Sequence, residues 1–178
     1  MNNATRPTDI NGNSYNRDLL VLVLMVGSFC TFLNSTLMNT AFPAIMKDFS
    51  ITTATVQWLT TGFMMVNGVM IPISAWLINR FSSKTMYLWA MLTFLLGTVV
   101  SFTAQNFGVL LAGRLIQGIG VGVSMPLLQT IMLSIFPPEK RGAAMGTVGL
   151  VIGLAPALGP TLSGCIVDNW TWRELFGM

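Results

Sequence analysis

The sequence predicts an all-α integral membrane protein that crosses the bilayer about five times. Of its 178 residues, 53% are hydrophobic and only 8% are charged, whereas a soluble domain carries about 25% charged residues. This is too little charge to cover a water-facing surface. The charges also lie between long uncharged runs, each of which exceeds the roughly 20 apolar residues that a spanning helix needs. These runs cover residues 19–46, 49–79, 85–113, 115–138 and 142–167.

The order of the elements follows from these runs. Residues 1–18 are polar, so we expect a disordered tail before an uncleaved first helix. Pro137 and Pro138 end the fourth helix because proline cannot continue a helix. Residues 168–178 form the start of a sixth helix. The five complete helices are expected at about 19–45, 56–78, 85–104, 107–136 and 141–167, with a polar stretch at 47–55 and turns at 79–84 and 105–106.

The basic residues predict the orientation. Only Lys47 and Arg173 fall on the side of the bilayer opposite the N-terminus. Six others fall on the side of the N-terminus, namely Arg6, Arg17, Arg80, Lys84, Lys140 and Arg141. Because cytoplasmic loops carry an excess of Lys and Arg, the N-terminus is expected in the cytoplasm, and the protein is expected in the cell membrane.

Arg114 is the most informative residue. It lies about seven residues into the fourth helix, which is roughly 10 Å deep at 1.5 Å per residue. A charge at such a depth costs at least about 2.5 kcal/mol and normally faces a protein interior or a water-filled path. Gln117 and Gly118 share its helix face. The alternative is that the side chain of Arg114 snorkels to the membrane surface.

Polar residues also lie within the first helix. Asn34 is near mid-span, and Asn39 follows it closer to the end. Such groups bind substrate or form hydrogen bonds between helices, and the sequence leaves both roles open.

The fifth helix is rich in glycine and contains Pro156 and Pro160. Small residues at spacings of three and four predict close helix packing, and the prolines predict a kink that shapes a gate. The glycines are Gly142, Gly146, Gly149, Gly153, Gly159 and Gly164.

Enzyme chemistry has no support in this sequence. It contains no histidine, no metal-ligand cluster and no phosphate-binding glycine loop, and every carboxylate lies at or outside a helix end. We therefore expect neither catalysis nor a cofactor nor a bound metal. The basic residues are scattered among loops, which argues against nucleic-acid binding.

Five motifs follow one another along most of the chain. They lie in the first helix, the loop between the second and third helices, the fourth helix, the fifth helix and the opening of the sixth. The motifs are Leu33–Pro43; Ala75–Lys84; Leu110, Arg114, Gln117, Gly118 and Gly120; Ala155–Pro156, Gly159–Pro160 and Ser163–Gly164; and Trp172–Phe176. In this order they resemble the N-terminal part of a major facilitator superfamily transporter, most like the fourteen-helix drug:proton antiporter group.

The resemblance implies a fold, a set of roles and partners. The chain would be about five helices of an incomplete six-helix half-bundle, in contact with lipid, and a complete version would move small hydrophobic or amphipathic substrates and protons. A first group, Arg114, Gln117, Asn34 and Asn39, would line the transport path and influence coupling. A second group, Asn79, Arg80 and Lys84, would help hold a cytoplasmic gate. A third group, Pro156, Gly159, Pro160 and Gly164, would restrain leak and set the direction of exchange.

Three departures from the family pattern stand out. Asn34 and Asn79 replace residues that are usually Asp, and Ser82 replaces a usual glycine. Asn34 cannot take up or release a proton, and Asn79 cannot form an ion pair. A proton-driven transporter would therefore carry its titrating group elsewhere; alternatively, the chain descends from a transporter and has lost coupling.

The chain ends at Met178, where a sixth helix would begin. Because substrate sites of such folds lie between two halves near mid-membrane, we expect that this polypeptide alone does not transport and is a fragment of a drug or small-molecule exporter. The alternative is a small membrane protein that associates through its helices with a larger transporter as partner or inhibitor. An importer is a third reading, against which the fifth-helix motif argues.

Overall fold

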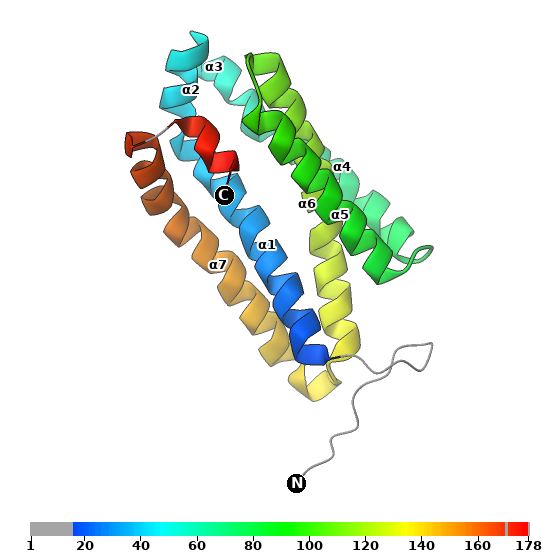
Figure 1. Ribbon diagram of the computed structural model, residues 1–178. Coiled ribbons are helices and arrows are strands. Elements are labelled where there is room, and N and C mark those ends of the chain that lie inside the picture. The colour runs from blue at the N-terminus through cyan, green and yellow to red at the C-terminus, as the bar shows by residue number, and fades with distance from the viewer. Residues whose placement is uncertain (1–15, 170, 178) are drawn as a thin grey trace.

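The structure, a computed structural model, describes residues 16–169 and 171–177, with only the backbone at 17 and 165–169. Residues 1–15, most of the predicted polar tail, lie outside the described residues. All regular secondary structure in the described residues is helical, and short turns connect the helices (Figure 1). Its helices are α1 Arg17–Thr40, α2 Phe42–Phe49, α3 Thr53–Val56, α4 Trp58–Ile78, α5 Ser83–Phe102, α6 Phe107–Ile135, α7 Pro138–Asn169 and the 3-10 helix η1 Trp172–Phe176.

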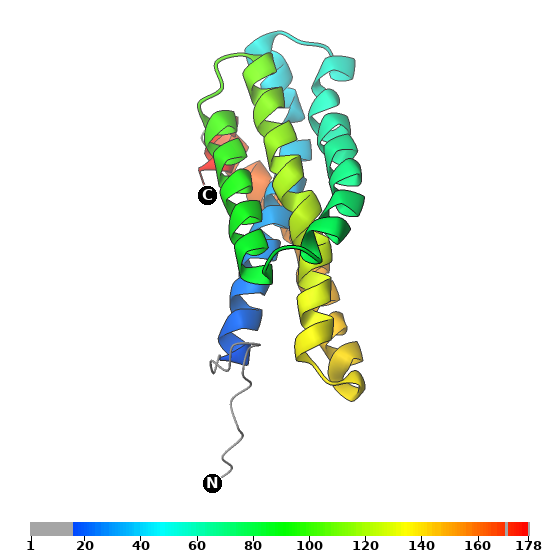
Figure 2. The same ribbon diagram turned by 90° about the vertical axis from the view of Figure 1, so that its right-hand side faces the viewer.

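Five helical segments in the described part of the chain are long and apolar enough to cross a membrane, which confirms the predicted all-α membrane fold. They are Asp18–Thr40, Thr53–Ile78, Ser83–Phe102, Phe107–Ile135 and Pro138–Gly164. The start of α1 and the turn between α6 and α7 lie together at the lower end of the bundle, and α2 and α3 lie at the upper end (Figures 1 and 2).

The first helix differs from the predicted range of 19–45 because it is broken at Ala41. Pro43 stands in the first turn of α2. Proline has no N–H to donate to the carbonyl four residues earlier, and its ring crowds that carbonyl. The regular bonding of α1 therefore ends at Thr40, and α2 continues to Phe49, within the stretch that was expected to be an irregular connection.

The other boundaries shift where side chains cap the helices. A short helical turn, α3, precedes the second spanning helix because the Thr52 hydroxyl accepts a hydrogen bond from the Thr55 N–H at 3.3 Å. The last spanning helix begins at Pro138 rather than Arg141, since proline is well tolerated in the first turn of a helix. Residues 168–178 were expected to begin a sixth helix; in the structure residues 168 and 169 still belong to α7, and Trp172–Phe176 form η1.

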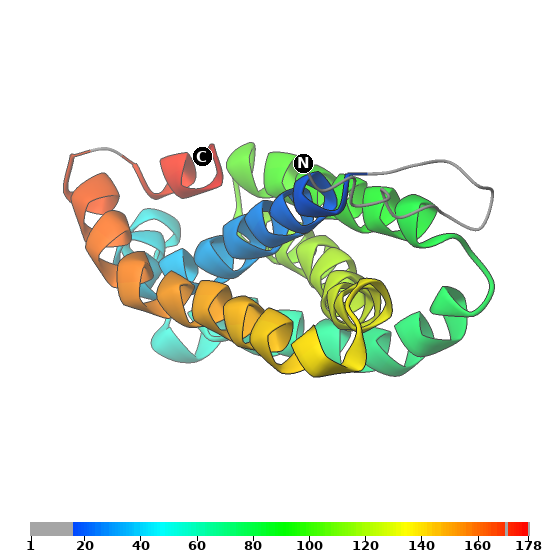
Figure 3. The ribbon, with the colours of Figure 1, turned by 90° about the horizontal axis from the view of Figure 1, so that it is seen from below.

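Helix α6 lies at the centre and packs along α4 and α5, while α1 packs along α7 (Figures 1 and 3). Glycines permit the close approach of α5 to α6. A Cβ atom built at Gly97 would lie 2.6 Å from the Gly113 carbonyl oxygen, and one at Gly120 would lie 2.6 Å from the Ala90 carbonyl oxygen. This packing brings polar side chains of α1, α5 and α6 together inside the bundle.

Candidate functional site: a buried polar cluster on α1, α5 and α6

Arg114 is buried in the bundle, with only 1% of its surface exposed, and Gln117 is fully buried. The side chain of Arg114 therefore faces the protein interior and does not snorkel to the membrane surface. Both residues face inward because they lie three residues apart on α6.

Four polar side chains form a continuous hydrogen-bonded cluster. Arg114 Nη1 donates to Gln117 Oε1 at 2.9 Å and to Asn34 Oδ1 at 3.3 Å. Gln117 Nε2 donates to Asn34 Oδ1 at 3.4 Å and to the Thr98 hydroxyl at 2.8 Å. Thr98 in turn donates to the Phe94 carbonyl. We call Arg114, Gln117, Asn34 and Thr98 the central cluster; it joins α1, α5 and α6.

The charge of Arg114 is only partly compensated. In the described part of the chain, the one ion pair joins Arg173 and Asp48, so no carboxylate neutralises Arg114 there. Its Nε atom is buried and has no hydrogen-bond partner. The guanidinium lies 4.6 Å from the centroid of the Phe63 ring, a cation–π contact of about 0.5–2 kcal/mol. A charge so buried and so incompletely paired points to function rather than to stability.

Asn34 connects the central cluster to the far end of the chain. Its Nδ2 donates to the Leu175 carbonyl oxygen of η1 at 3.3 Å, while its Oδ1 accepts from Arg114 and Gln117. A carboxylate at this position could accept from Arg114 but could not donate to Leu175 unless it were protonated. The amide of Asn34 can therefore bond both the Leu175 carbonyl oxygen and the donors of Arg114 and Gln117, whereas an ionised aspartate could bond only the donors.

Asn39, grouped with these residues on sequence grounds, lies apart from them. It is exposed near the end of α1 and accepts a hydrogen bond from the Thr60 hydroxyl at 3.1 Å. The structure therefore brings together three of the four predicted path residues and places Asn39 at a contact between α1 and α4.

The three residues of the predicted gate loop are exposed and make only local contacts. Asn79 Nδ2 donates to the Ala75 carbonyl oxygen at 3.0 Å and thereby caps α4, as an amide can. The Arg80 guanidinium lies 5.0 Å from the centroid of the Trp76 ring. Lys84 has no partner among residues 16–169 and 171–177. Within the described residues, the side chains of Asn79 and Arg80 therefore contact only α4 and do not join this loop to another helix.

The glycines of α7 pack less closely than predicted. Nothing lies within 4 Å of a Cβ atom built at Gly164 or at the other glycines of this helix except Gly159, whose Cβ would lie 2.9 Å from Thr36 Cβ. The prediction of close packing along the whole glycine series is therefore wrong for the described chain. Pro156 and Pro160 are exposed and lie on either side of this contact.

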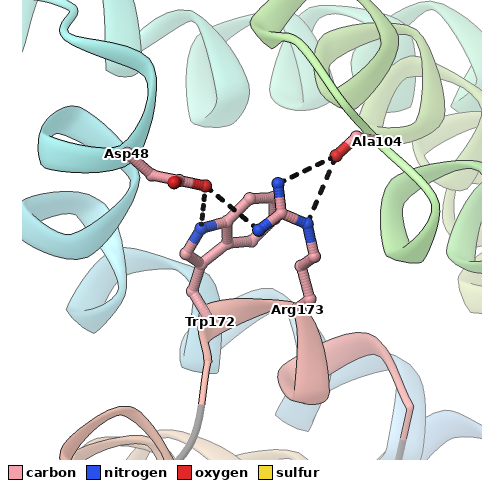
Figure 4. A network of polar contacts seen from close by, with 4 residues as sticks. All are labelled: Asp48, Ala104, Trp172 and Arg173. Atoms are coloured by element: carbon pink, nitrogen blue, oxygen red, sulfur yellow. Dashed lines mark hydrogen bonds and ion pairs between the residues drawn. The ribbon is translucent and has the colours of Figure 1, made fainter.

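A second polar group lies at the upper end of the bundle (Figure 4). Trp172 Nε1 and Arg173 Nη1 both donate to Asp48 Oδ2 at 3.0 Å. Arg173 also donates to the Ala104 carbonyl oxygen from Nε at 3.3 Å and from Nη2 at 3.1 Å. We call Asp48, Trp172 and Arg173 the end cluster; it fixes η1 to α2 and to the connection between α5 and α6.

Sequence reasoning missed the end cluster, Thr98 and Phe63. The end cluster joins residues 124 and 125 positions apart. Trp172 and Arg173 belong to a motif noted in the sequence, but nothing in that motif identifies Asp48 as their partner. Thr98 and Phe63 carry no signal of their own, because a single Thr or Phe within an apolar run is ordinary in a membrane helix.

An apolar groove of about 270 Å³ lies between α4, α5 and α6. Its lining includes Met70, Trp89 and Val123 but no member of the central cluster. It is therefore separate from the candidate site.

Replacing Arg173 by alanine should loosen η1. The ion pair, whose side chains are 33% and 43% exposed, contributes at most about 1 kcal/mol, and each hydrogen bond to Ala104 adds about 1 kcal/mol. The combined loss of about 2–3 kcal/mol corresponds to about a 30–150-fold increase in the population with η1 detached. A cysteine at the buried position of Leu175, in a background without Cys30 and Cys165, should react with a thiol reagent faster by this factor. Asp48→Asn, which keeps an acceptor for Trp172, should give a smaller increase, and an unchanged rate in Arg173→Ala would rule out this anchoring role.

Comparison with known proteins agrees with this arrangement of helices. The family model described as Major Facilitator Superfamily matches residues 24–178. The uncharacterized MFS-type transporter YcnB of Bacillus subtilis is 53% identical over 95% of this chain and 36% of its own length. The lincomycin resistance protein LmrB of the same organism is 41% identical over 88% of this chain and 33% of its own length.

More distant relatives extend the comparison. The multidrug export protein EmrB of Escherichia coli is 30% identical over 89% of this chain and 31% of its own length. A bacterial homolog of the human lysosomal transporter Spinster, in an inward-facing and unoccupied conformation, superposes with a TM-score of 0.68 at 22% identity, over 83% of this chain and 30% of that one. The chain thus spans about a third of the length of the curated relatives that it matches. The chain is a multi-pass membrane protein and belongs to the major facilitator superfamily.

Proposed function

We propose that this chain forms the N-terminal part of a secondary active transporter that exports drugs or other small amphipathic molecules. The observation that carries the proposal is the central cluster. In it the buried Arg114 bonds Asn34 on α1 and Gln117 on α6, and Gln117 in turn bonds Thr98 on α5, so that no carboxylate of the described residues takes part. Such a buried charge in a membrane protein marks a path for a substrate or an ion. The names of LmrB and EmrB, a resistance protein and an export protein, support export rather than import.

Proton antiport is the proposed coupling. Asn34, Gln117 and Thr98 do not titrate near neutral pH, and a guanidinium remains protonated in proteins. The proton carrier is therefore expected outside the central cluster.

Two further groups of residues are proposed to act in transport. A cytoplasmic gate would include Asn79, Arg80 and Lys84, and the exchange path would be shaped by Pro156, Gly159, Pro160 and Gly164. Five of these residues are exposed, whereas Gly164 is half-buried and Gly159 is buried. The exposed ones are available to a second half of the bundle.

Transport by a complete transporter, meaning a full-length protein with this segment at its N-terminus, tests the proposal. Reconstituted in lipid vesicles with an imposed pH gradient, it should move at least one of a panel of anionic and cationic dyes, and collapse of the gradient should stop the movement. The present chain alone should move none. Movement that is insensitive to the gradient would contradict proton coupling, and the absence of movement for every dye would contradict export.

The N-terminus is proposed to lie in the cytoplasm, because six basic residues lie on its side of the bilayer and two lie on the other. A cysteine at Asn3 should therefore resist an impermeant thiol reagent added to whole cells, whereas a cysteine at Gln105, in the turn between α5 and α6, should react. Labelling of the cysteine at position 3 together with protection of the one at position 105 would show that the N-terminus lies outside the cell and contradict the proposed topology.

A further inference from the structure

The central cluster carries one positive charge and, within the described residues, no negative one. Its other members are amides and a hydroxyl, and the described carboxylates lie elsewhere. Asp18 and Glu139 are in the first turns of α1 and α7, Asp48 is engaged by Trp172 and Arg173, and Glu174 is exposed on η1. A buried cation without a counter-charge is unfavourable in a membrane protein. A negative charge brought to Arg114 would therefore be strongly attracted.

Asn34 marks the side from which such a charge can approach. It is half-buried, whereas Arg114 and Gln117, which bond it, are buried. Its Oδ1 accepts from these two residues at 3.3 and 3.4 Å, beyond the usual range of a good hydrogen bond. An ionised oxygen in that place would form shorter and stronger bonds than an amide oxygen does.

Arg114 also retains donor capacity. Its Nε is buried without a partner, and a guanidinium presents donors in a planar fork that matches a carboxylate in two-point contact. The Phe63 ring, 4.6 Å from the guanidinium, supplies an apolar wall beside this polar centre. The cluster thus combines an unpaired cationic donor with an aromatic surface.

The identity of residue 34 decides the charge of the cluster. An ionised aspartate there would take the acceptor position and neutralise Arg114, so an arriving anion would meet no net charge. Asn34 leaves the positive charge in place. We propose that Arg114 and Asn34 form an acceptor for the carboxylate group of an amphipathic substrate, so that this transporter prefers anionic over cationic molecules. This inference rests on the proposed export function for its biological meaning, but the acceptor itself can be tested separately.

Equilibrium binding to the purified complete transporter is the first test, with carboxyfluorescein as the anionic probe and ethidium as the cationic one. Fluorescence anisotropy should show at least tenfold tighter binding of carboxyfluorescein. Asn34→Asp should raise the Kd of carboxyfluorescein at least tenfold without weakening ethidium. Gln117→Glu, which places a carboxylate on the same guanidinium, should do the same and serves as the second variant if Asn34→Asp does not fold.

Asn106→Asp is the matched control. It makes the same change of one amide to one carboxylate, at the residue that caps α6 by accepting from the Val109 N–H at 2.9 Å. Aspartate caps as well as asparagine, and position 106 lies outside the central cluster. This variant should leave both dissociation constants within twofold of the parent values.

Transport of the same two dyes in lipid vesicles separates this inference from the proposed function. Binding of carboxyfluorescein without transport of either dye would contradict export and leave the anion acceptor standing. Transport of ethidium without saturable binding of carboxyfluorescein would overturn the acceptor and leave export standing. Unchanged carboxyfluorescein binding in folded Asn34→Asp or Gln117→Glu would also overturn it.

Discussion

Replacing Arg114 by alanine is expected to abolish efflux by the complete transporter while leaving membrane insertion intact. The substitution removes the only charge of the central cluster, leaves the buried Gln117 Oε1 without a donor, and leaves Asn34 Oδ1 with only the long bond from Gln117 Nε2. A buried group that loses its partner costs about 1–3 kcal/mol, and its loss disturbs the arrangement of α1 and α6 at the candidate site. Insertion of the helix itself becomes easier, because burial of an arginine costs about 2.5–3.5 kcal/mol on insertion scales.

Dye efflux from cells and the amount of protein in the membrane fraction measure the two effects separately. Arg114→Lys keeps the charge but loses the planar fork, so we expect it to retain less than about a tenth of the efflux. Lys140→Ala, at an exposed position in the first turn of α7, is the control and should transport normally. Unchanged efflux in Arg114→Ala, at normal membrane levels, would exclude a role for Arg114 in transport.

The sequence was sufficient to predict the five spanning helices and the core of the candidate site. Arg114 stood out because a charge within an apolar run has a high energetic cost, and Gln117 followed from the helical repeat. Asn34 stood out because it is polar near mid-span. These inferences depend only on local order and on the membrane as solvent, which is why the structure reproduces their proximity.

The remaining features depend on how helices rotate and pack, which local order does not reveal. Asn39 is five residues from Asn34 on α1 and therefore points away from it, toward Thr60. The glycines of α7 suggested close packing, yet the close contacts between helices lie chiefly along α6, at Gly113 and Gly120. Glycine spacing indicates that a close approach is possible, but the neighbouring helix determines whether it occurs.

The close approach of α5 to α6 leads to the second large effect: Gly97→Ala should destabilise the bundle. The added Cβ would lie 2.6 Å from the Gly113 carbonyl oxygen and 2.7 Å from the Gln117 backbone nitrogen. Both are backbone atoms, so the clash can be relieved only by moving the two helices apart. Overpacking of this kind costs about 1–3 kcal/mol, and the better helix propensity of alanine recovers no more than about 1 kcal/mol.

Gly149→Ala on α7 is the matched comparison, because nothing lies within 4 Å of its added Cβ. It should leave the detergent-solubilised chain as stable as the parent or raise its thermal midpoint, whereas Gly97→Ala should lower that midpoint by several degrees. The same displacement would move Gln117 away from Thr98, the residue that follows Gly97, and so should weaken the 2.8 Å bond between them. A complete transporter with Gly97→Ala should therefore lose efflux as well as stability. Equal midpoints for the two variants would show that α5 and α6 do not approach as closely as the structure indicates, and the central cluster would then lose the contact that ties it to α5.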